Sequence, residues 1–399
     1  MNRTEFHTKA NNYLCILIAF FLPVYIFVVP ALIIFLLLNW IAEGGFAEKF
    51  KLLTQSRIAL LFILFYFLHL IGMLWTENKP SGYFDLEVKL SLLLFPIILS
   101  TGKSDIKKIL WSLVWGCLTA SLICLIVASA HYLKTGENHF EYTLLSIWLH
   151  PAYLAMYIVF SIAIILFSFN TQFSTLKKTG FLFLILLLSG FTILLSSKIG
   201  TISLILLLLS FVIHHIIIHK AWVSGLLFFT GILVLIFSIF HFLPYTKNRI
   251  INSVYWIQHI NEIDIEHTES DAARILVWQS DISLIKENYL YGVGTGDIKD
   301  ELIKKYIASD YKEILERKLN AHNQFFQTTI GLGVVGGLVL VSLFISGIYN
   351  AIKGKKKIFL AFLIILLLNF LVESMLEVQA GVMFYAFFNS LLLFSQKEQ

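Results

Sequence analysis

The feature that most constrains this chain is a series of apolar runs, each about as long as a lipid bilayer is thick. One run extends from Leu182 to Leu195 without a charged residue. A helix needs about 20 mostly apolar residues to cross the hydrocarbon core. Of the 399 residues, 58% are hydrophobic and 14% are charged, whereas a soluble domain has roughly 25% charged residues. The sequence therefore predicts an integral membrane protein and excludes a soluble enzyme, a disordered chain or a secreted disulfide scaffold.

The runs are continuously apolar rather than alternating, which favours an all-α bundle over a β-barrel. Residues 13–42 hold Pro23 and Pro30, and we interpret this stretch as two short spans that turn between the prolines. With ten clear spans, this predicts a polytopic protein of about twelve transmembrane helices. A single kinked span over 13–42 would give eleven and move the N-terminus to the other side. The clear spans lie near residues 57–75, 86–101, 106–132, 147–168, 180–196, 199–217, 220–243, 323–350, 358–376 and 378–395.

Lysine and arginine in the short connections indicate the orientation of the bundle. With the N-terminus in the cytoplasm, sixteen of these residues lie on the inner side, and the short outer connections and helix ends hold four. The basic cluster Lys355–Lys357 then marks topology. We predict no nucleic-acid partner from it.

One outer connection, residues 244–321, differs from all the others. It has 78 residues without a spanning segment and carries ten basic and thirteen acidic side chains. Loops of this length are usually functional. Apolar residues at spacings of three and four predict a helix over 271–287, and a second helix is expected over 298–319. Between them lies Gly292–Asp297, which predicts a tight turn that exposes its backbone.

This connection divides the chain into three predicted parts. We expect an N-terminal transmembrane bundle of about nine spans in residues 1–243. A helical outer domain in residues 244–322 would rest on the mouth of the bundle. Residues 323–399 would form the last three spans.

Once the orientation is set, most polar side chains at membrane depth fall at outer helix ends. Charged groups are costly there, so they usually line a protein interior or an aqueous cavity, which predicts one outward-facing site. The alternatives are that Glu373 and Glu377 form a helix-end pair one turn apart, and that His150 marks a helix start before Pro151. The group consists of Lys89, His131, His150, Lys198, His322, Glu373 and Glu377.

No metal or cofactor site is predicted. The three cysteines lie inside apolar segments, so neither a disulfide framework nor a thiolate site can be inferred. His215 and His219 have a metal-ligand spacing, but they lie at a cytoplasmic span end without a nearby acid, which favours an interfacial polar cluster. The turn Gly292–Asp297 matches no nucleotide-binding fingerprint. We interpret it as structural, with a phosphate-binding nest as the less favoured alternative.

Five motifs, in this order, give the chain a recognisable pattern. They are Arg274–Trp278, Gly292–Gly296, Ala321–Phe325, Gly331–Gly336 and Glu373–Val382. Together with many spans and one large outer loop before the last three, the chain resembles the O-antigen ligase superfamily. That superfamily includes lipopolysaccharide O-antigen ligases, O-antigen polymerases and protein O-oligosaccharyltransferases.

The resemblance implies a multi-pass enzyme of the bacterial inner (cytoplasmic) membrane. Such an enzyme moves a glycan from a polyprenyl diphosphate carrier to an acceptor hydroxyl on the periplasmic face, without a nucleotide sugar, metal or other cofactor. The implied partners are the lipid-linked glycan donor, a lipid A core or other glycan acceptor, and membrane lipids.

The resemblance also assigns roles to individual residues. A diphosphate leaving group needs fixed positive charge, and Arg274 is the best candidate for this binding and catalytic role. His322 matches the histidine of the family's His-Asn pair and would activate the acceptor. Lys198 stands where the family usually has an arginine, so it supplies charge to the diphosphate without a bidentate fork. The possible supporting residues are Asn323, Glu373, Glu377 and His150.

Each of the main assignments has a structural alternative. Arg274 could form a surface ion pair with Asp271, three residues away. His322 could share helix capping with Asn323. Lys198 could contact lipid headgroups, because lysines near span ends extend toward the interface.

Two function classes remain open on the sequence. The first is a glycan transferase, either a ligase or a polymerase. These two differ in the acceptor, which the residues do not reveal. A lipid-linked glycan transporter is the second class. It should have polar groups near the bilayer midplane and broken helices in paired halves, whereas the charges here gather at outer helix ends.

Overall fold

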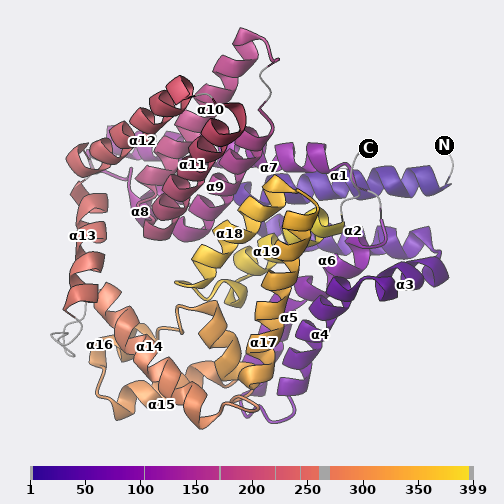
Figure 1. Ribbon diagram of the computed structural model, residues 1–399. Helices are drawn as coiled ribbons and strands as arrows, with labels where there is room; N and C mark the ends of the chain where they lie inside the picture. The colour runs from indigo at the N-terminus through magenta and orange to yellow at the C-terminus, as the bar shows by residue number, and fades with distance from the viewer. Residues whose placement is uncertain are drawn as a thin grey trace. The chain divides into compact units, whose positions relative to one another are not determined.

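The computed structural model describes residues 3–102, 104–169, 172–220, 222–242, 244–259 and 270–394 (Figure 1). Within these ranges every regular element is a helix, so the predicted all-α class is confirmed. The chain forms two compact units. The first comprises Met1–Thr8, Trp40–Ser104 and Asn252–Gln399, and the second comprises Lys9–Asn39 and Asp105–Ile251.

The helices follow one another without a long structureless segment in the described ranges. The elements from the N-terminus to residue 258 are α1 (Arg3–Val24), η1 (Ile26–Val28), α2 (Val29–Glu43), α3 (Phe46–Gln55), α4 (Arg57–Gly72), α5 (Lys79–Lys89), α6 (Ser91–Leu99), α7 (Ile106–Thr135), α8 (Tyr142–Leu145), α9 (Pro151–Phe167), α10 (Thr175–Leu194), α11 (Lys198–His219), α12 (Trp222–Phe242) and α13 (Pro244–Gln258). Those that follow are α14 (Ser270–Glu287), α15 (Ile298–Ala308), α16 (Lys312–Arg317), α17 (Gln324–Lys353), α18 (Lys357–Phe370), η3 (Met375–Glu377) and α19 (Gln379–Phe394).

In the second unit, helix α9 is the core. Every residue from Pro151 to Leu166 is buried, as expected of a helix that is apolar on all sides. Helices α7, α10 and α11 pack against it. The turn predicted between Pro23 and Pro30 is present, because α1 ends at Val24 and α2 begins at Val29.

In the first unit, α17 contacts α4, α14 and α18, and α19 packs against α6. The predicted helix over 271–287 is confirmed as α14. Helix α13 was not predicted. The prediction of one helix over 298–319 is wrong, because α15 and α16 are separate helices. The chain leaves α15 through Asp310, whose φ of 54° is left-handed, while the Tyr311 amide donates to the Tyr306 carbonyl at 3.0 Å. This is a Schellman ending without the usual glycine, so the sequence carried no signal for it.

The span predicted over 86–101 is also divided. Helix α5 ends at Lys89, and after Leu90 the nine-residue helix α6 begins at Ser91. Pro96 lies inside α6 and cannot donate a hydrogen bond to the carbonyl one turn earlier.

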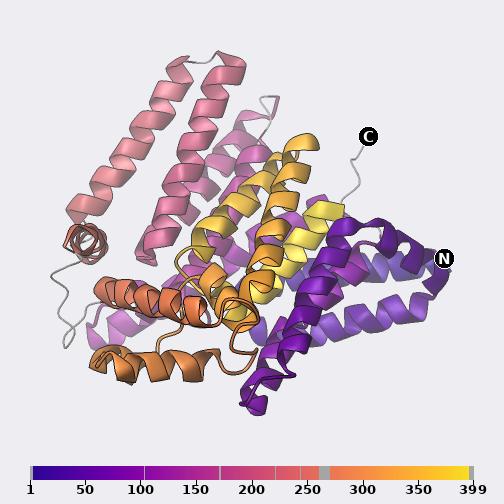
Figure 2. The same cartoon turned by 60° about the horizontal axis from the view of Figure 1, so that its bottom comes forward.

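Helix α17 is broken at Gly333, where φ is 66° and ψ is −169°. The break separates the Val334 amide from the Ile330 carbonyl, its usual helical partner. Both groups are paired elsewhere: the Val334 amide donates to the Tyr289 carbonyl at 2.7 Å, and the Ile330 carbonyl accepts from the Val293 amide at 2.8 Å. The turn after α14 therefore supplies hydrogen-bond partners for the two groups that the break in α17 separates. Figure 2 shows α14 and α15 lying along each other beside this helix.

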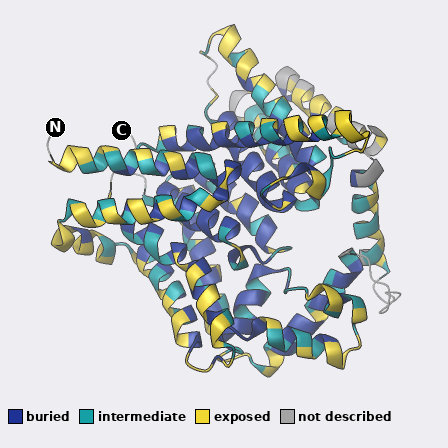
Figure 3. Ribbon diagram, turned by 180° about the vertical axis from the view of Figure 1, so that it is seen from behind, coloured by how far each residue is buried: buried dark blue, intermediate teal, exposed yellow. Residues whose placement is uncertain are grey.

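Several described helices have the length and apolar composition of membrane spans. Five qualify singly, and a sixth arises if α3 and α4, bent by 92° at their junction, form one span. Shorter apolar helices are α9, α18 and α19. Large apolar side chains point outward on α2, as at Ile34, Phe35 and Leu38, and exposed and buried positions alternate along the N-terminal helices (Figure 3). These features support a multi-pass membrane protein, and the count of twelve stays a prediction.

We expect Gly333→Ala to destabilise the protein. Its backbone lies in a region that is essentially restricted to glycine and costs other residues about 1–3 kcal/mol. A Cβ atom there would lie 2.3 Å from the Leu290 carbonyl oxygen. The thermal midpoint of the detergent-solubilised variant should fall. Gly190→Ala is the matched control, because its Cβ would meet no atom within 4 Å. Equal midpoints for the two variants would refute the pairing described above.

Candidate functional site

Arg274, Glu373 and His322 meet in the first unit through one shared carboxylate. Arg274 donates from Nη2 to Oε1 of Glu373 at 2.6 Å. Nδ1 of His322 lies 3.1 Å from Oε2 of the same side chain. The three side chains are 17–22% exposed, so each is partly shielded and still open to a ligand.

Each member of this triad comes from a different segment of the chain. Arg274 lies in the second turn of α14, which the glycine turn fixes to α17. His322 lies two residues before α17, in a left-handed conformation with φ of 45°. Such a conformation is uncommon for a side-chain-bearing residue and is often found at functional sites. Glu373 follows α18.

The predicted helix over 358–376 does not reach Glu373. Helix α18 ends at Phe370, and an irregular segment with the single turn η3 leads to α19. Glu373 and Glu377 are therefore not one turn apart on a helix, as the sequence analysis expected them to be, and the alternative of a helix-end pair is wrong. Irregular backbone at membrane depth is tolerated where protein surrounds it. Here it lets the two carboxylates face different partners.

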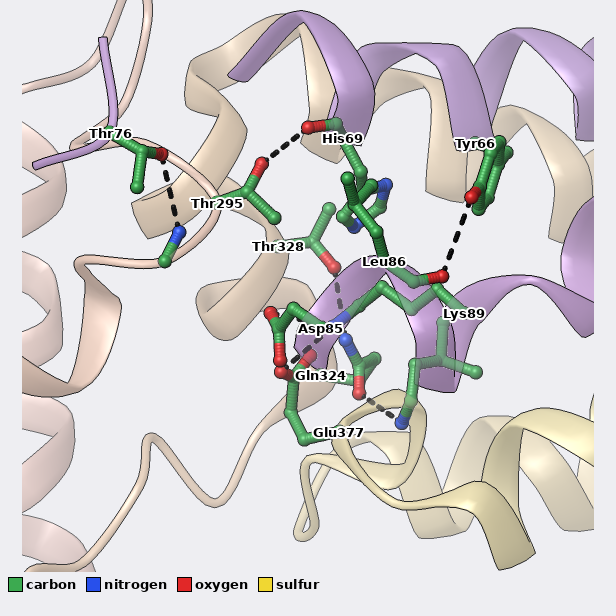
Figure 4. A network of polar contacts seen from close by, with 12 residues as sticks. Tyr66, His69, Thr76, Asp85, Leu86, Lys89, Thr295, Gln324, Thr328 and Glu377 are labelled. Atoms are coloured by element: carbon green, nitrogen blue, oxygen red, sulfur yellow. Dashed lines mark hydrogen bonds and ion pairs between the residues drawn. The ribbon is translucent and has the colours of Figure 1, made fainter. Parts of the chain in front are cut away.

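Glu377 belongs to a second buried network, shown in Figure 4. The ammonium group of Lys89 lies 2.9 Å from Glu377 Oε2 and 3.0 Å from Asp85 Oδ2. Lys89 is only 1% exposed, so this ion-pair network satisfies a charge that would be very costly alone. Gln324 accepts from the Leu376 amide at 2.6 Å and ties η3 to the start of α17.

Arg274 keeps most of its donors for a ligand. A guanidinium group has five N–H donors. One donates to Glu373, and the nearest Asp271 oxygen is 3.7 Å from Nη1, beyond a hydrogen bond. Nε of Arg274 is buried without a hydrogen-bond partner among the described residues. Because Nε is enclosed by the protein, the donors open to an anionic ligand are those of Nη1, which makes no hydrogen bond to Asp271.

Asn323 and His150 each cap the start of a helix. Asn323 caps α17: its side-chain oxygen accepts from the amides of Phe325 and Phe326 at 2.9 and 3.1 Å. His322 does not share this cap, because its ring faces Glu373. In the second unit, His150 precedes α9 and its Nδ1 accepts from the Ala152 amide at 3.4 Å, as the helix-start interpretation predicts. A supporting role for His150 in the site stays a prediction.

Lys198 begins helix α11 in the second unit, where helix amides add to its positive charge. The turn before Lys198 is contacted by Arg249, a cation that the sequence analysis did not single out. Arg249 of α13 donates to the Ser196 carbonyl at 2.9 Å, and its guanidinium lies 4.0 Å from the ring centre of Tyr142. A prediction of helix α13 would have indicated Arg249, because this helix places Thr246 and Arg249 one turn apart beside Ser196.

The glycine turn uses its amides within the protein. Those of Val293 and Gly294 donate to α17 carbonyls, and the Gly296 amide donates to Thr76 at 3.3 Å. The structural interpretation is confirmed, because these donors are not available to a phosphate. Asp297 in turn accepts from the amides of Glu77 and Asn78 at 2.8 and 2.7 Å and joins the turn to α5.

Among the described side chains, one group brings three possible metal-binding atoms together: His131 in the last turns of α7, and Glu137 and His139 after it. The two rings stack at 3.6 Å and share the Glu137 carboxylate. His215 and His219 have a metal-ligand spacing in the sequence, and the side chain of His219 lies outside the described residues. All three cysteines are buried and free.

Residues 182–341 match the family model described as O-antigen ligase. The match covers Lys198, Arg249, Arg274 and His322 and ends within α17. None of the curated proteins matches the chain.

Helix α14 also carries a buried acid that the sequence analysis missed. Asp281 lies on the same face as Val277 and Leu284, fully buried, and neither oxygen has a hydrogen-bond partner among the described residues. Burial raises the pKa of the Asp281 carboxyl to about 9. The neutral acid is therefore the form present in the folded protein at pH 7.

This burial predicts a pH dependence of stability. An unfolded chain releases the Asp281 proton near pH 3.8, whereas the folded protein keeps it up to about pH 9, so rising pH favours unfolding across that window. Asp281→Asn should match the wild-type thermal midpoint near pH 4 and exceed it at pH 8. Asp310→Asn, at an exposed position, is the control. A gap between wild type and Asp281→Asn that stays constant with pH would contradict this assignment.

Proposed function

We propose, from the match of residues 182–341 to the O-antigen ligase family model, that this chain is a ligase that transfers a glycan from a polyprenyl diphosphate carrier to an acceptor hydroxyl of lipid A core. The coarser assignment, a membrane glycan transferase of the ligase and polymerase family, follows from the matched domain. The observation that carries the proposal is the Glu373 carboxylate shared between Arg274 and His322. We place the reaction at the periplasmic face of the inner membrane.

In this proposal Arg274 holds the diphosphate of the donor. The bond between the sugar anomeric carbon and the diphosphate oxygen breaks, and negative charge grows on that oxygen. A guanidinium group can offer two parallel hydrogen bonds to phosphate oxygens and cannot lose its own charge. Glu373 keeps the planar group oriented through Nη2, while the Nη1 donors face the ligand.

His322 acts as the general base. Glu373 accepts from Nδ1–H of the ring, so Nε2 carries the lone pair that receives the acceptor proton. The acceptor oxygen then forms the new bond to the anomeric carbon, and the carrier diphosphate leaves. The same carboxylate thus orients the base and the phosphate-binding cation.

Lys198 supplies a second positive charge for the diphosphate. Its place at the N-terminus of α11 supports this role, because helix amides and an ammonium group both favour anions. Arg249, held against the same turn by the Ser196 carbonyl, provides a guanidinium close to the position where lysine replaces the family's usual arginine.

Loss of the base or of the phosphate-binding cation should abolish transfer without preventing membrane insertion. We expect His322→Ala to lower the transfer rate by roughly 10²–10⁴-fold, the usual contribution of general base catalysis. Arg274→Ala should lose a comparable amount, and Arg274→Lys should retain part of it. The assay is transfer by purified protein in proteoliposomes.

The matched control is Arg317→Ala, which removes an arginine from the surface pair with Glu313 on α16. Its transfer rate should equal that of wild type. Full activity of both His322→Ala and Arg274→Ala would overturn the proposed function.

The acceptor determines whether the chain is a ligase or a polymerase. Deletion of a ligase should remove all O-chain from lipid A core, because no chain can be joined to it. The expected gel of surface glycan from the deletion strain therefore shows bare core. A gel with a single repeat on the core would show instead that the protein is a polymerase.

A further inference from the structure

A cavity of about 470 Å³ opens beside His322 within the first unit. This volume falls in the range of roughly 300–1,000 Å³ that small-molecule sites occupy. Helix α5 forms one wall with Ser81, Phe84 and Asp85, and Glu377 lies at its base. Of the triad residues, His322 alone lines it, so the imidazole faces Glu373 with one nitrogen and borders the cavity as well.

The polar groups at the base of the cavity are held in place by buried contacts. Lys89 holds Asp85 and Glu377 with its single ammonium group, and Gln324 anchors η3 (Figure 4). Asp85 keeps an oxygen that Lys89 does not bind, and such an oxygen accepts hydrogen bonds from hydroxyl groups. Glu377 is also held by the side chain of Gln324. Asn320 and Gln327 add amide groups to the lining. Fixed acceptors and amides beside the exposed ring of Phe84 suit a sugar, which has hydroxyl groups and an apolar face.

The rim of the cavity carries two further cations. Lys299 lies on α15, and Lys318 follows α16 in a left-handed conformation with φ of 49°. Both are exposed, and neither has an ion-pair partner among the described residues. By contrast, Lys304 and Lys305 on the same helix are paired with Glu301 and Glu287. Unpaired cations at a polar cavity attract an anionic ligand.

We propose that this cavity is the acceptor subsite, and that it takes a sugar carrying a phosphate group. The proposal rests on the transfer reaction proposed above. Asp85 holds a sugar hydroxyl, Lys299 and Lys318 hold the phosphate, and the reacting hydroxyl lies at His322. Arg274 and its diphosphate stay outside this cavity, so donor and acceptor approach His322 separately.

The test is steady-state transfer by the full chain in proteoliposomes. The donor is the carrier-linked glycan, and the acceptor is purified lipid A core that carries phosphate on its core sugars. The double variant Lys299→Gln/Lys318→Gln should raise the acceptor KM roughly tenfold, with kcat and the donor KM unchanged. Removing the core-sugar phosphate should raise the wild-type acceptor KM by a similar factor and add nothing in the double variant.

Lys304→Gln is the matched control, because it removes a paired lysine from α15 outside the cavity. It should leave all constants unchanged. An unchanged acceptor KM in the double variant would overturn the subsite, and so would a rise in the donor KM alone, which would place the lysines on the carrier diphosphate.

Failure of the subsite and failure of the proposed function give different results. If His322→Ala is inactive while the lysine variant behaves like wild type, the acceptor subsite is wrong and the transfer mechanism stands. If His322→Ala and Arg274→Ala transfer normally, the proposed function itself fails.

Discussion

The exchange of backbone hydrogen bonds at the break of α17 is the constraint on which the first unit depends. Gly333 interrupts the helix, and the turn after α14 supplies the partners that the break removes. Unpaired backbone groups at membrane depth would cost several kcal/mol each, so the break and the turn require one another. This exchange holds α14, which carries Arg274, against α17, which follows His322. Asp297 then extends the same frame to α5 and the wall of the cavity.

Charge in the site is arranged around two shared groups, the carboxylate of Glu373 and the ammonium group of Lys89. Glu373 serves both Arg274 and His322, while Asp85 and Glu377 share Lys89. Side chains held by such pairs lose little further conformational freedom when a substrate binds, so the site is preorganised. The donors that remain, Nη1 of Arg274 and the ammonium groups of Lys299 and Lys318, are available to bind an anionic substrate.

Much of the fold could be predicted from the sequence, because apolar runs and helical spacing report burial directly. This holds for α14, for the turn between Pro23 and Pro30, and for the glycine turn. The break between α15 and α16 could not be predicted, since Asp310 rather than glycine adopts the left-handed conformation there. The division at Leu90 was likewise not predicted, because no glycine or proline stands at that position.

The candidate site was predictable as a set of residue types, but its pairing was not. Arg274, His322 and Glu373 are far apart in the sequence, and only the end of α18 at Phe370 lets Glu373 turn toward the other two. Arg249 was not predicted as a site residue, because its helix, α13, was not expected. The burial of Asp281 was not predicted, because a single acid on an amphipathic helix is usually exposed.

The central claim is that Arg274, Glu373 and His322 act as one unit, and a double-mutant cycle on the transfer rate tests it most directly. Wild type, Glu373→Gln, His322→Ala and the combined variant would be compared at saturating donor and acceptor. If Glu373 acts through His322 and Arg274, the combined loss should be far smaller than the product of the two single losses. Losses that multiply would show that the two residues act independently, and would contradict the account.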